Sequence, residues 1–176
     1  MWSSDRLRRS RRTVLLGVCL TLGACTIRPL LLETADDQDV RAQLEAITIV
    51  GLDGRLGQLV RNSLLDQLNP ASLSGPNRYI LQVELRRNAS SLGIQLDDVI
   101  TRFNLTLTAR FELVDATDGR VLYEDQVRRI ASYNVSRQPY ATLSAEVDAE
   151  RRVANEVGSN IRTVLAVYFA NQATST

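Results

Sequence analysis

The sequence contains no histidine and no lysine, so all 21 of its basic residues are arginines. The lack of histidine excludes serine-histidine and cysteine-histidine catalysis, as well as zinc sites that depend on imidazole. Only two cysteines are present, and aromatic residues make up 5% of the chain. The formal net charge of +1 gives no basic excess for nucleic-acid binding. These absences favour a protein that is not an enzyme and has no nucleic-acid partner.

The N-terminus has the pattern of a secretory signal peptide. Five arginines precede a short apolar run over residues 13–22, which leads into Leu22-Gly23-Ala24-Cys25. The run is much shorter than the roughly 20 residues that cross a bilayer as a helix, so cleavage fits better than a stable span. Loss of residues 1–24 leaves 16 arginines against 19 acids, a formal net charge of −3. The positive charge of the whole chain therefore comes from its signal peptide.

The tetrapeptide ending at Cys25 resembles the lipobox of bacterial lipoproteins, whose cysteine receives lipid and becomes the N-terminus after cleavage. This resemblance implies that Cys25 is lipidated and that several acyl chains attach the protein to a membrane that it does not span. Lipoproteins retained at the inner membrane typically have aspartate after this cysteine, so Thr26 implies the outer membrane. Cys19 lies in the segment that is removed, which leaves no disulfide within the mature chain.

The mature chain of about 150 residues is long enough for one domain with its own core. Its first twenty residues are acidic and weakly patterned, which is typical of a tether. We therefore predict a lipidated tether over 25–45, a single folded domain over 46–170 and a flexible tail over 171–176.

Hydropathy patterns predict the elements of this domain. A β-branched run over 46–50 predicts a strand, and apolar residues at steps of three and four over 55–68 predict an amphipathic helix. Strict alternation over 79–86 and 102–113 predicts two strands that each have one apolar face.

A turn at Asp118-Gly119 leads to a fourth strand over about 121–133, with a bulge expected near Asp125 because its alternation is less regular. A helical stripe beyond Pro139 predicts a long last helix. The order β-α-β-β-β-α indicates an α+β fold, a two-layer sandwich of a four-stranded sheet with two helices on one face. The opposite face of the sheet is expected to be polar and uncovered.

No motif in the sequence forms a convincing active site, cofactor site or metal site. Asp97-Asp98 is an acidic pair, but neighbours on a strand point to opposite faces, so a solvated pair is favoured over a catalytic one. The region also lacks the alternating oxygen ligands of a calcium loop. The glycines of Gly51-Leu52-Asp53-Gly54 are not followed by the Gly-Lys-Ser/Thr of a phosphate loop, and a turn explains them.

A set of arginines on the expected open sheet face and its loops is the strongest surface feature. Its members are Arg86, Arg87, Arg102, Arg110, Arg128, Arg129 and Arg137. Guanidinium groups bind phosphate through paired hydrogen bonds, and a flat polar sheet also packs against other proteins. The alternative is a solvated surface whose charge is balanced by neighbouring acids, and the sequence leaves both interpretations open.

Three C-terminal segments carry a resemblance to a known family. They are Ser132-Tyr133-Asn134-Val135, the run from Pro139 to Arg152 and the closing segment from Ile161 to Phe169. They resemble the lipopolysaccharide-assembly lipoprotein family LptE in its alphaproteobacterial form. The strand Tyr79-Ile80-Leu81-Gln82-Val83 is similar as well, and the likeness extends over nearly all of the mature chain.

The resemblance implies an outer-membrane lipoprotein that plugs the LptD β-barrel, supports its assembly and assists lipopolysaccharide insertion into the outer leaflet. Basic side chains bind lipopolysaccharide in other members, and the resemblance points here to Arg87 and Arg137, at the ends of strands. The alternative is an auxiliary lipoprotein of a lipid-trafficking ABC transport system, which also combines a lipobox with a small α/β domain.

Overall fold

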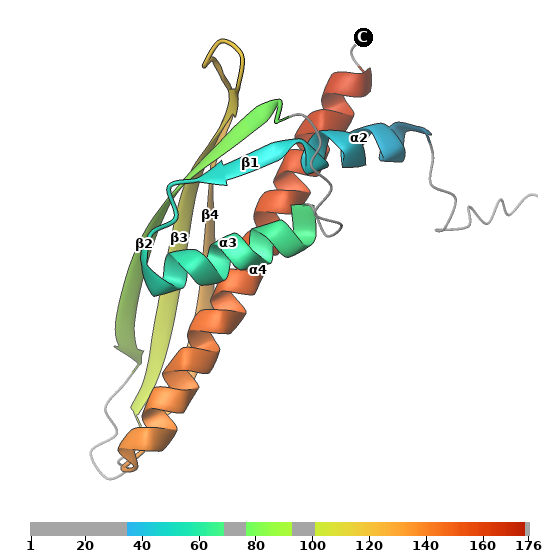
Figure 1. Cartoon of the computed structure of the whole chain (residues 1–176). Helices are drawn as coiled ribbons and strands as arrows, with labels where there is room; N and C mark the ends of the chain where they lie inside the picture. Colours follow the sequence, from blue (N-terminus) through green and yellow to red (C-terminus); the bar gives the residue numbers. More distant parts are fainter. Residues whose placement is uncertain (1–34, 69–76, 93–100, 175–176) are drawn as a thin grey trace, which may run out of the picture. The chain divides into compact units, whose positions relative to one another are not determined.

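The computed structural model describes residues 35–68, 77–92 and 101–174. Its elements follow one another as α2 (Ala35–Glu45), β1 (Ile47–Val50), α3 (Gly54–Leu68), β2 (Tyr79–Leu92), β3 (Thr101–Asp115), β4 (Val121–Val135) and α4 (Pro139–Thr174). Helices α3 and α4 lie on the same side of the sheet (Figure 1). The predicted α+β class and two-layer architecture are confirmed, and α2 is an additional helix.

The four strands form one sheet in the order β1-β2-β3-β4. Strands β2, β3 and β4 form an antiparallel meander, in which Val83 lies opposite Phe111 and Phe111 lies opposite Asp125. Strand β1 pairs in parallel with the start of β2, because helix α3 carries the chain back between them. Since β1 has only four residues, most of β2 pairs with no described strand on that side.

The turn between β3 and β4 has the chemistry that the sequence predicts. Gly119 has a φ of 73°, a conformation that glycine adopts without steric cost. The Asp115 carboxylate accepts a hydrogen bond of 2.8 Å from the backbone N–H of Thr117. This bond lowers the pKa of Asp115, because it stabilises the ionised carboxylate.

The irregularity of β4 lies closer to this turn than we expected. Leu113 pairs with Tyr123 and Val114 pairs with Val121, so Leu122 is the extra residue of a bulge. Asp125, near which we predicted the bulge, is in regular register. Alternation in β4 is blurred beyond the bulge because charged residues occur on both faces of the strand.

The core lies between the sheet and the two long helices. On β3 the side chains of Leu105, Leu107 and Leu113 are fully buried, and Phe111 is 1% exposed. The helices contribute residues at helical spacing that are fully buried: Val60 and Leu64 from α3, and Val153, Val157, Ile161 and Leu165 from α4. The opposite face of the sheet carries polar and charged side chains, as predicted, and most of them are exposed or half-buried.

The folded domain begins earlier than the predicted boundary at residue 46. Residues 35–45, which we assigned to the tether, form helix α2 instead, and this helix packs against α4. Val40 and Leu44 share one face of α2, and Leu44 is only 3% exposed. Two apolar residues that pack on the core therefore fix a segment whose acidic composition is typical of a linker.

The C-terminal boundary also differs from the prediction. Helix α4 extends to Thr174, so residues 171–174 of the predicted flexible tail are helical. Phe169 is 2% exposed and its ring lies 5.2 Å from the ring of Tyr79, centroid to centroid. This contact holds the end of α4 against the start of β2.

Several predictions concern residues outside the described ranges. The signal peptide, Cys25, the first part of the tether and Asp97-Asp98 are among them. Within the described ranges, no helix combines the length and the apolar character that crossing a membrane requires. In the same part of the chain, acidic and sulfur side chains do not gather into a group suited to holding a metal ion.

Candidate functional site

Arg87 belongs to a charged cluster between the sheet and the helices. Its guanidinium donates a hydrogen bond to the carboxylate of Glu146 and lies 3.5 Å from the carboxylate of Glu150, both on α4. Glu150 also forms an ion pair of 3.0 Å with Arg55 at the start of α3. Glu150 is 9% exposed, so one buried carboxylate joins β2, α3 and α4.

The same cluster acts on a tyrosine of β4. Burial, together with the negative charge of Glu146, raises the pKa of Tyr133, and the positive charge of Arg87 partly offsets this effect. The ring of Tyr133 stacks on Phe103, with 5.8 Å between ring centroids. Tyr133 therefore stays neutral and contributes to packing at ordinary pH.

Two arginines that we placed on the open sheet face lie on the face that meets the helices. Arg87 has the same orientation as Val83, whose side chain is in the core. Arg129 donates a hydrogen bond to the side chain of Asn160 on α4. The alternation of side chains along β2 and β4 determines which face these arginines occupy, because residues two apart point to the same side of the sheet.

The open face keeps four of the predicted arginines, namely Arg86, Arg102, Arg110 and Arg128. Arg86 lies opposite Thr108, and Thr108 lies opposite Arg128, so two arginines flank one threonine in a row across three strands. Arg86 forms an ion pair of 3.2 Å with Glu84, in which both side chains are more than half exposed. Such a pair contributes little stability and exchanges readily with other partners.

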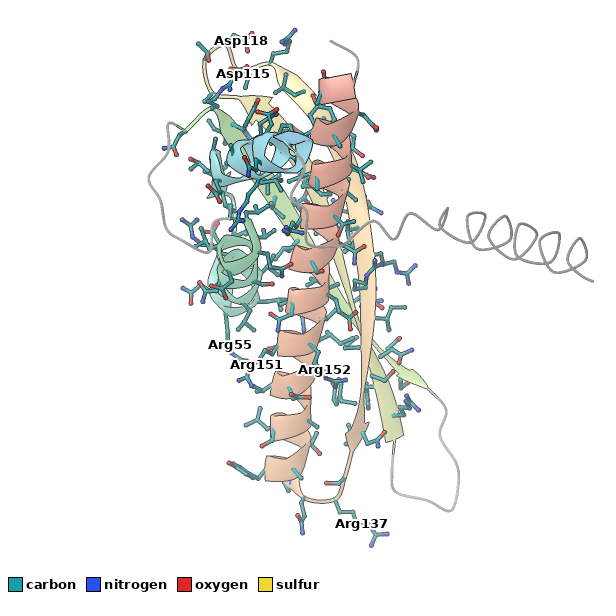
Figure 2. The ribbon with its side chains drawn as sticks, turned by 90° about the vertical axis from the view of Figure 1, so that its right-hand side faces the viewer. Arg55, Asp115, Asp118, Arg137, Arg151 and Arg152 are labelled. Carbon is teal, nitrogen blue, oxygen red and sulfur yellow. The ribbon has the colours of Figure 1, made fainter. Side chains whose placement is uncertain are left out.

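Arg137 lies at one end of the domain, in the connection between β4 and α4. Figure 2 shows it at the end opposite the β3-β4 turn with Asp115 and Asp118. Its side chain is exposed, and no side chain within the described ranges forms an ion pair with it. Arg137 is therefore available to an anion, whereas Arg87 is already held by two carboxylates.

The structure does not bring Arg87 and Arg137 together. Arg87 pairs with Leu107, whereas the end of β4 at Val135 pairs with Thr101, six residues further along β3. At about 3.3 Å per residue, this separates the two sites by about 20 Å along the strands. One phosphate group cannot contact both arginines.

The lipopolysaccharide-assembly family LptE matches residues 40–165, which is most of the folded domain. The chain belongs to the LptE family. Its membership makes it a lipopolysaccharide-assembly lipoprotein, as the C-terminal segments indicated.

Individual relatives share the fold or part of the sequence of this chain. A protein described as a lipoprotein from Caulobacter crescentus is 29% identical, with a TM-score of 0.64, over 76% of this chain and 97% of that one. Rare lipoprotein B from Shewanella oneidensis has the same fold, with a TM-score of 0.54 and 15% identity, over 72% of this chain and 96% of that one. An uncharacterized protein of Rickettsia prowazekii is 24% identical over 88% of this chain and 95% of its own length.

The acidic partners of Arg87 were missed at the level of sequence. A signal for the position of Arg87 was present, because it continues the alternation of Leu81, Val83 and Leu85 on the apolar face. Its contact with Glu146 joins residues 59 positions apart. No local pattern relates residues at such a separation, so the cluster required the tertiary structure.

Proposed function

We propose that this protein plugs an LptD-type β-barrel of the outer membrane, supports the assembly of that barrel and assists delivery of lipopolysaccharide to the outer leaflet. The observation that carries this proposal is the open face of the sheet in a chain of the LptE family. Most side chains on this face are polar across three long strands, and no described helix covers it. The interior of a large outer-membrane barrel is polar as well, so such a face suits the lumen.

The lipid anchor is the second part of the proposal. The resemblance of residues 22–25 to a lipobox supports lipidation at Cys25. Several acyl chains hold a protein stably on a membrane surface, and the described helices do not span one. The anchor then keeps the domain on the periplasmic side of the outer membrane, where a barrel partner is accessible.

Lipopolysaccharide is the proposed ligand, and its phosphates are the groups that arginine binds best. Arg137 is the stronger of the two expected contacts, because its guanidinium is exposed and free of ion pairs within the described ranges. Arg87 has to release Glu146 before it can hold a phosphate. The four open-face arginines add positive charge that the barrel lumen or the glycolipid can meet.

The direct test of the proposed function is co-purification of the tagged full-length lipoprotein from membranes. A single large β-barrel protein is the expected partner. Recovery of inner-membrane transporter subunits without a barrel would instead support the ABC-transport alternative and reject the plug. Cys25→Ala with a cleavable export signal serves as a companion variant, because it should keep the fold but lose membrane attachment.

A further inference from the structure

The two edges of the sheet are protected to different degrees. On the β4 edge, the backbone N–H of Gln126 donates to the carboxylate of Asp125 at 2.7 Å. The carbonyl oxygen of Arg128 accepts from the Arg129 guanidinium at 2.8 Å, and that of Ser132 accepts from Arg152 of α4 at 3.2 Å. Side chains thus occupy three of the backbone groups that another strand would need.

The direction of the backbone groups on β2 follows from two hydrogen bonds at its start. The N–H of Tyr79 donates to the carbonyl of Ala46, toward β1, while the carbonyl of Arg78 accepts from Ala116, toward β3. Successive residues of a strand alternate in this respect. Odd-numbered residues of β2 therefore direct their N–H and C=O groups away from β3, and even-numbered residues direct theirs toward β3.

Beyond the end of β1, these odd-numbered residues form an open edge. Strand β1 covers Tyr79 to Gln82, and Gly51 then lies so close to Val83 that a Cβ there would be 3.0 Å from the Val83 carbonyl oxygen. From Leu85 to Ser91, no described residue caps the outward N–H and C=O groups. Figure 1 shows β2 continuing along the margin of the sheet past the end of β1.

This part of β2 is also accessible from both sides. Every residue from Arg86 to Ser91 is exposed, those on the helix-facing side included. Many natural proteins protect an exposed strand edge with a bulge, a proline or a cap. The run 86–91 has no proline, and its pairing with β3 is regular.

We propose that residues 85–91 of β2 are a strand-addition site, on which an extended acidic segment of the barrel protein forms a further strand of the sheet. Taking the barrel as the source rests on the proposed function. A closed barrel has no free strand edge, so the segment comes from a loop or a terminus. Backbone hydrogen bonds supply the affinity in this mode of recognition, and side chains supply the specificity.

The positive charge next to this edge favours an acidic segment as the added strand. An added strand places one side chain beside Arg86, at the end of the row that continues through Thr108 to Arg128. The row contains two arginines and no acid, and the ion pair between Arg86 and Glu84 is highly exposed. A carboxylate beside Arg86 therefore gains a partner at little cost.

A second copy of this chain fits the edge less well. Strand β1 already occupies the start of β2 in each copy, so self-pairing is confined to the stretch beyond Val83. Two such stretches in antiparallel pairing bring Arg86 and Arg87 of both copies into one short ladder. The four arginines then share a short ladder that contains no acid, and their like charges repel one another.

The first experiment is co-purification of the barrel with Ala89→Pro in the full-length lipoprotein. Proline removes the outward N–H of residue 89 and breaks none of the bonds to β3, so folding is preserved while the added strand loses a ladder hydrogen bond. Recovery of the barrel should fall about tenfold. Ile130→Pro is the matched control, because its N–H also points away from β3 but lies on the β4 edge between the capped carbonyls of Arg128 and Ser132, and it should retain the barrel.

The second experiment uses the unaltered complex and needs no substitution. Amide hydrogen exchange at Arg87 and Ala89 should slow markedly when the barrel is bound, while Arg86 and Asn88 are protected in both states through β3. Alternating protection of this kind distinguishes strand addition from contact between side chains. Unchanged exchange at Arg87 and Ala89 would overturn the proposal, whatever the behaviour of the proline variants.

The charge argument is tested by Arg86→Glu, which should reduce barrel recovery. Arg151→Glu on α4 is the control on the other side of the domain (Figure 2) and should leave recovery unchanged. Self-association that Ala89→Pro abolishes would identify a second copy as the occupant and reject the barrel segment. A wild-type protein that recovers no barrel would reject the proposed function itself, whereas loss confined to Ala89→Pro and Arg86→Glu supports the strand site.

Discussion

The two faces of the sheet come from the same strands but depend on different forces. On β3, Leu107 is fully buried against the helices, while its neighbour Thr108 is half-buried between two arginines of the open face. The helix-facing side gains stability from the burial of apolar surface and from a few charged groups that are held in place. The open side contributes little to stability. Folding therefore places little constraint on its residue types, which can be suited to binding. Stability and recognition are thus divided between alternate residues of one strand.

A pair of substitutions at adjacent residues of β3 tests whether the two faces contribute differently to stability. Leu107→Ala should lower the free energy of unfolding by about 3 kcal/mol or more, because it opens a cavity in the core. Thr108→Ala should cost about 1 kcal/mol or less, since it removes only partly exposed atoms. Urea denaturation followed by circular dichroism measures both. Equal losses would show that the open face is covered in the isolated domain.

The charged cluster gives the next largest effect. Glu150→Gln should destabilise the domain by about 1 to 2 kcal/mol, because Arg87 and Arg55 lose a shared, buried carboxylate but remain partly solvated. Asp148→Asn is the control, since its pair with Arg152 lies on the exposed side of α4 and should contribute about 0.5 kcal/mol or less. A cost for Glu150→Gln no greater than that of the control would mean that the cluster has no structural role.

Lipopolysaccharide binding by the isolated domain compares Arg137, which has no ion pair within the described ranges, with Arg87, which is paired with Glu146. Arg137→Ala should weaken binding by about threefold to tenfold through loss of a charge-assisted contact. Glu146→Gln should strengthen binding if Arg87 takes part, because it releases that guanidinium from its carboxylate. Light scattering or fluorescence titration with purified lipopolysaccharide measures these changes. Binding that neither substitution alters would remove both arginines from the proposed site.

The smallest effect concerns alkaline stability. The pKa of Tyr133 is raised in the folded state above its ordinary value of 10.0, chiefly by burial. The stability that this tyrosine contributes is therefore fully present below pH 10 and is lost as the pH rises through the folded-state pKa. Tyr133→Phe should flatten the decline of the unfolding free energy as the pH rises above 10.0. A decline as steep as that of the wild type would assign it to other groups.

Much of this arrangement was predictable, and the failures have physical causes. Alternation of apolar and polar residues over 79–86 and 102–113 predicted the two central strands, because one face of each strand is buried in the core and the other is exposed to solvent. The second half of β2 was missed, since residues 86–91 are exposed on both sides and have no alternation to detect. Helix α2 was missed because two apolar residues among acids mark a helix only once α4 is there to receive them.

The site was predictable in type but not in detail. A surplus of arginine near an open sheet face was evident, yet Arg87 and Arg129 needed the alternation of their strands to be assigned to the other face. Their partners on α4 depend on how the helix crosses the sheet. The difference between the two sheet edges depends on the same crossing, because Arg152 of α4 caps one of the β4 carbonyls.

Helix α2 limits how far a lipid-anchored form of this domain can move. Because helix α2 starts at Ala35, nine residues separate it from Cys25, and the ten residue steps from Cys25 to Ala35 span at most about 35 Å. The apolar band of an outer-membrane barrel alone is about 25 Å tall. If Cys25 carries the proposed lipid anchor, the domain would search for a partner only within a thin layer beside the membrane. Confinement of this kind raises the local concentration of the domain around any barrel in the same membrane without a single additional contact.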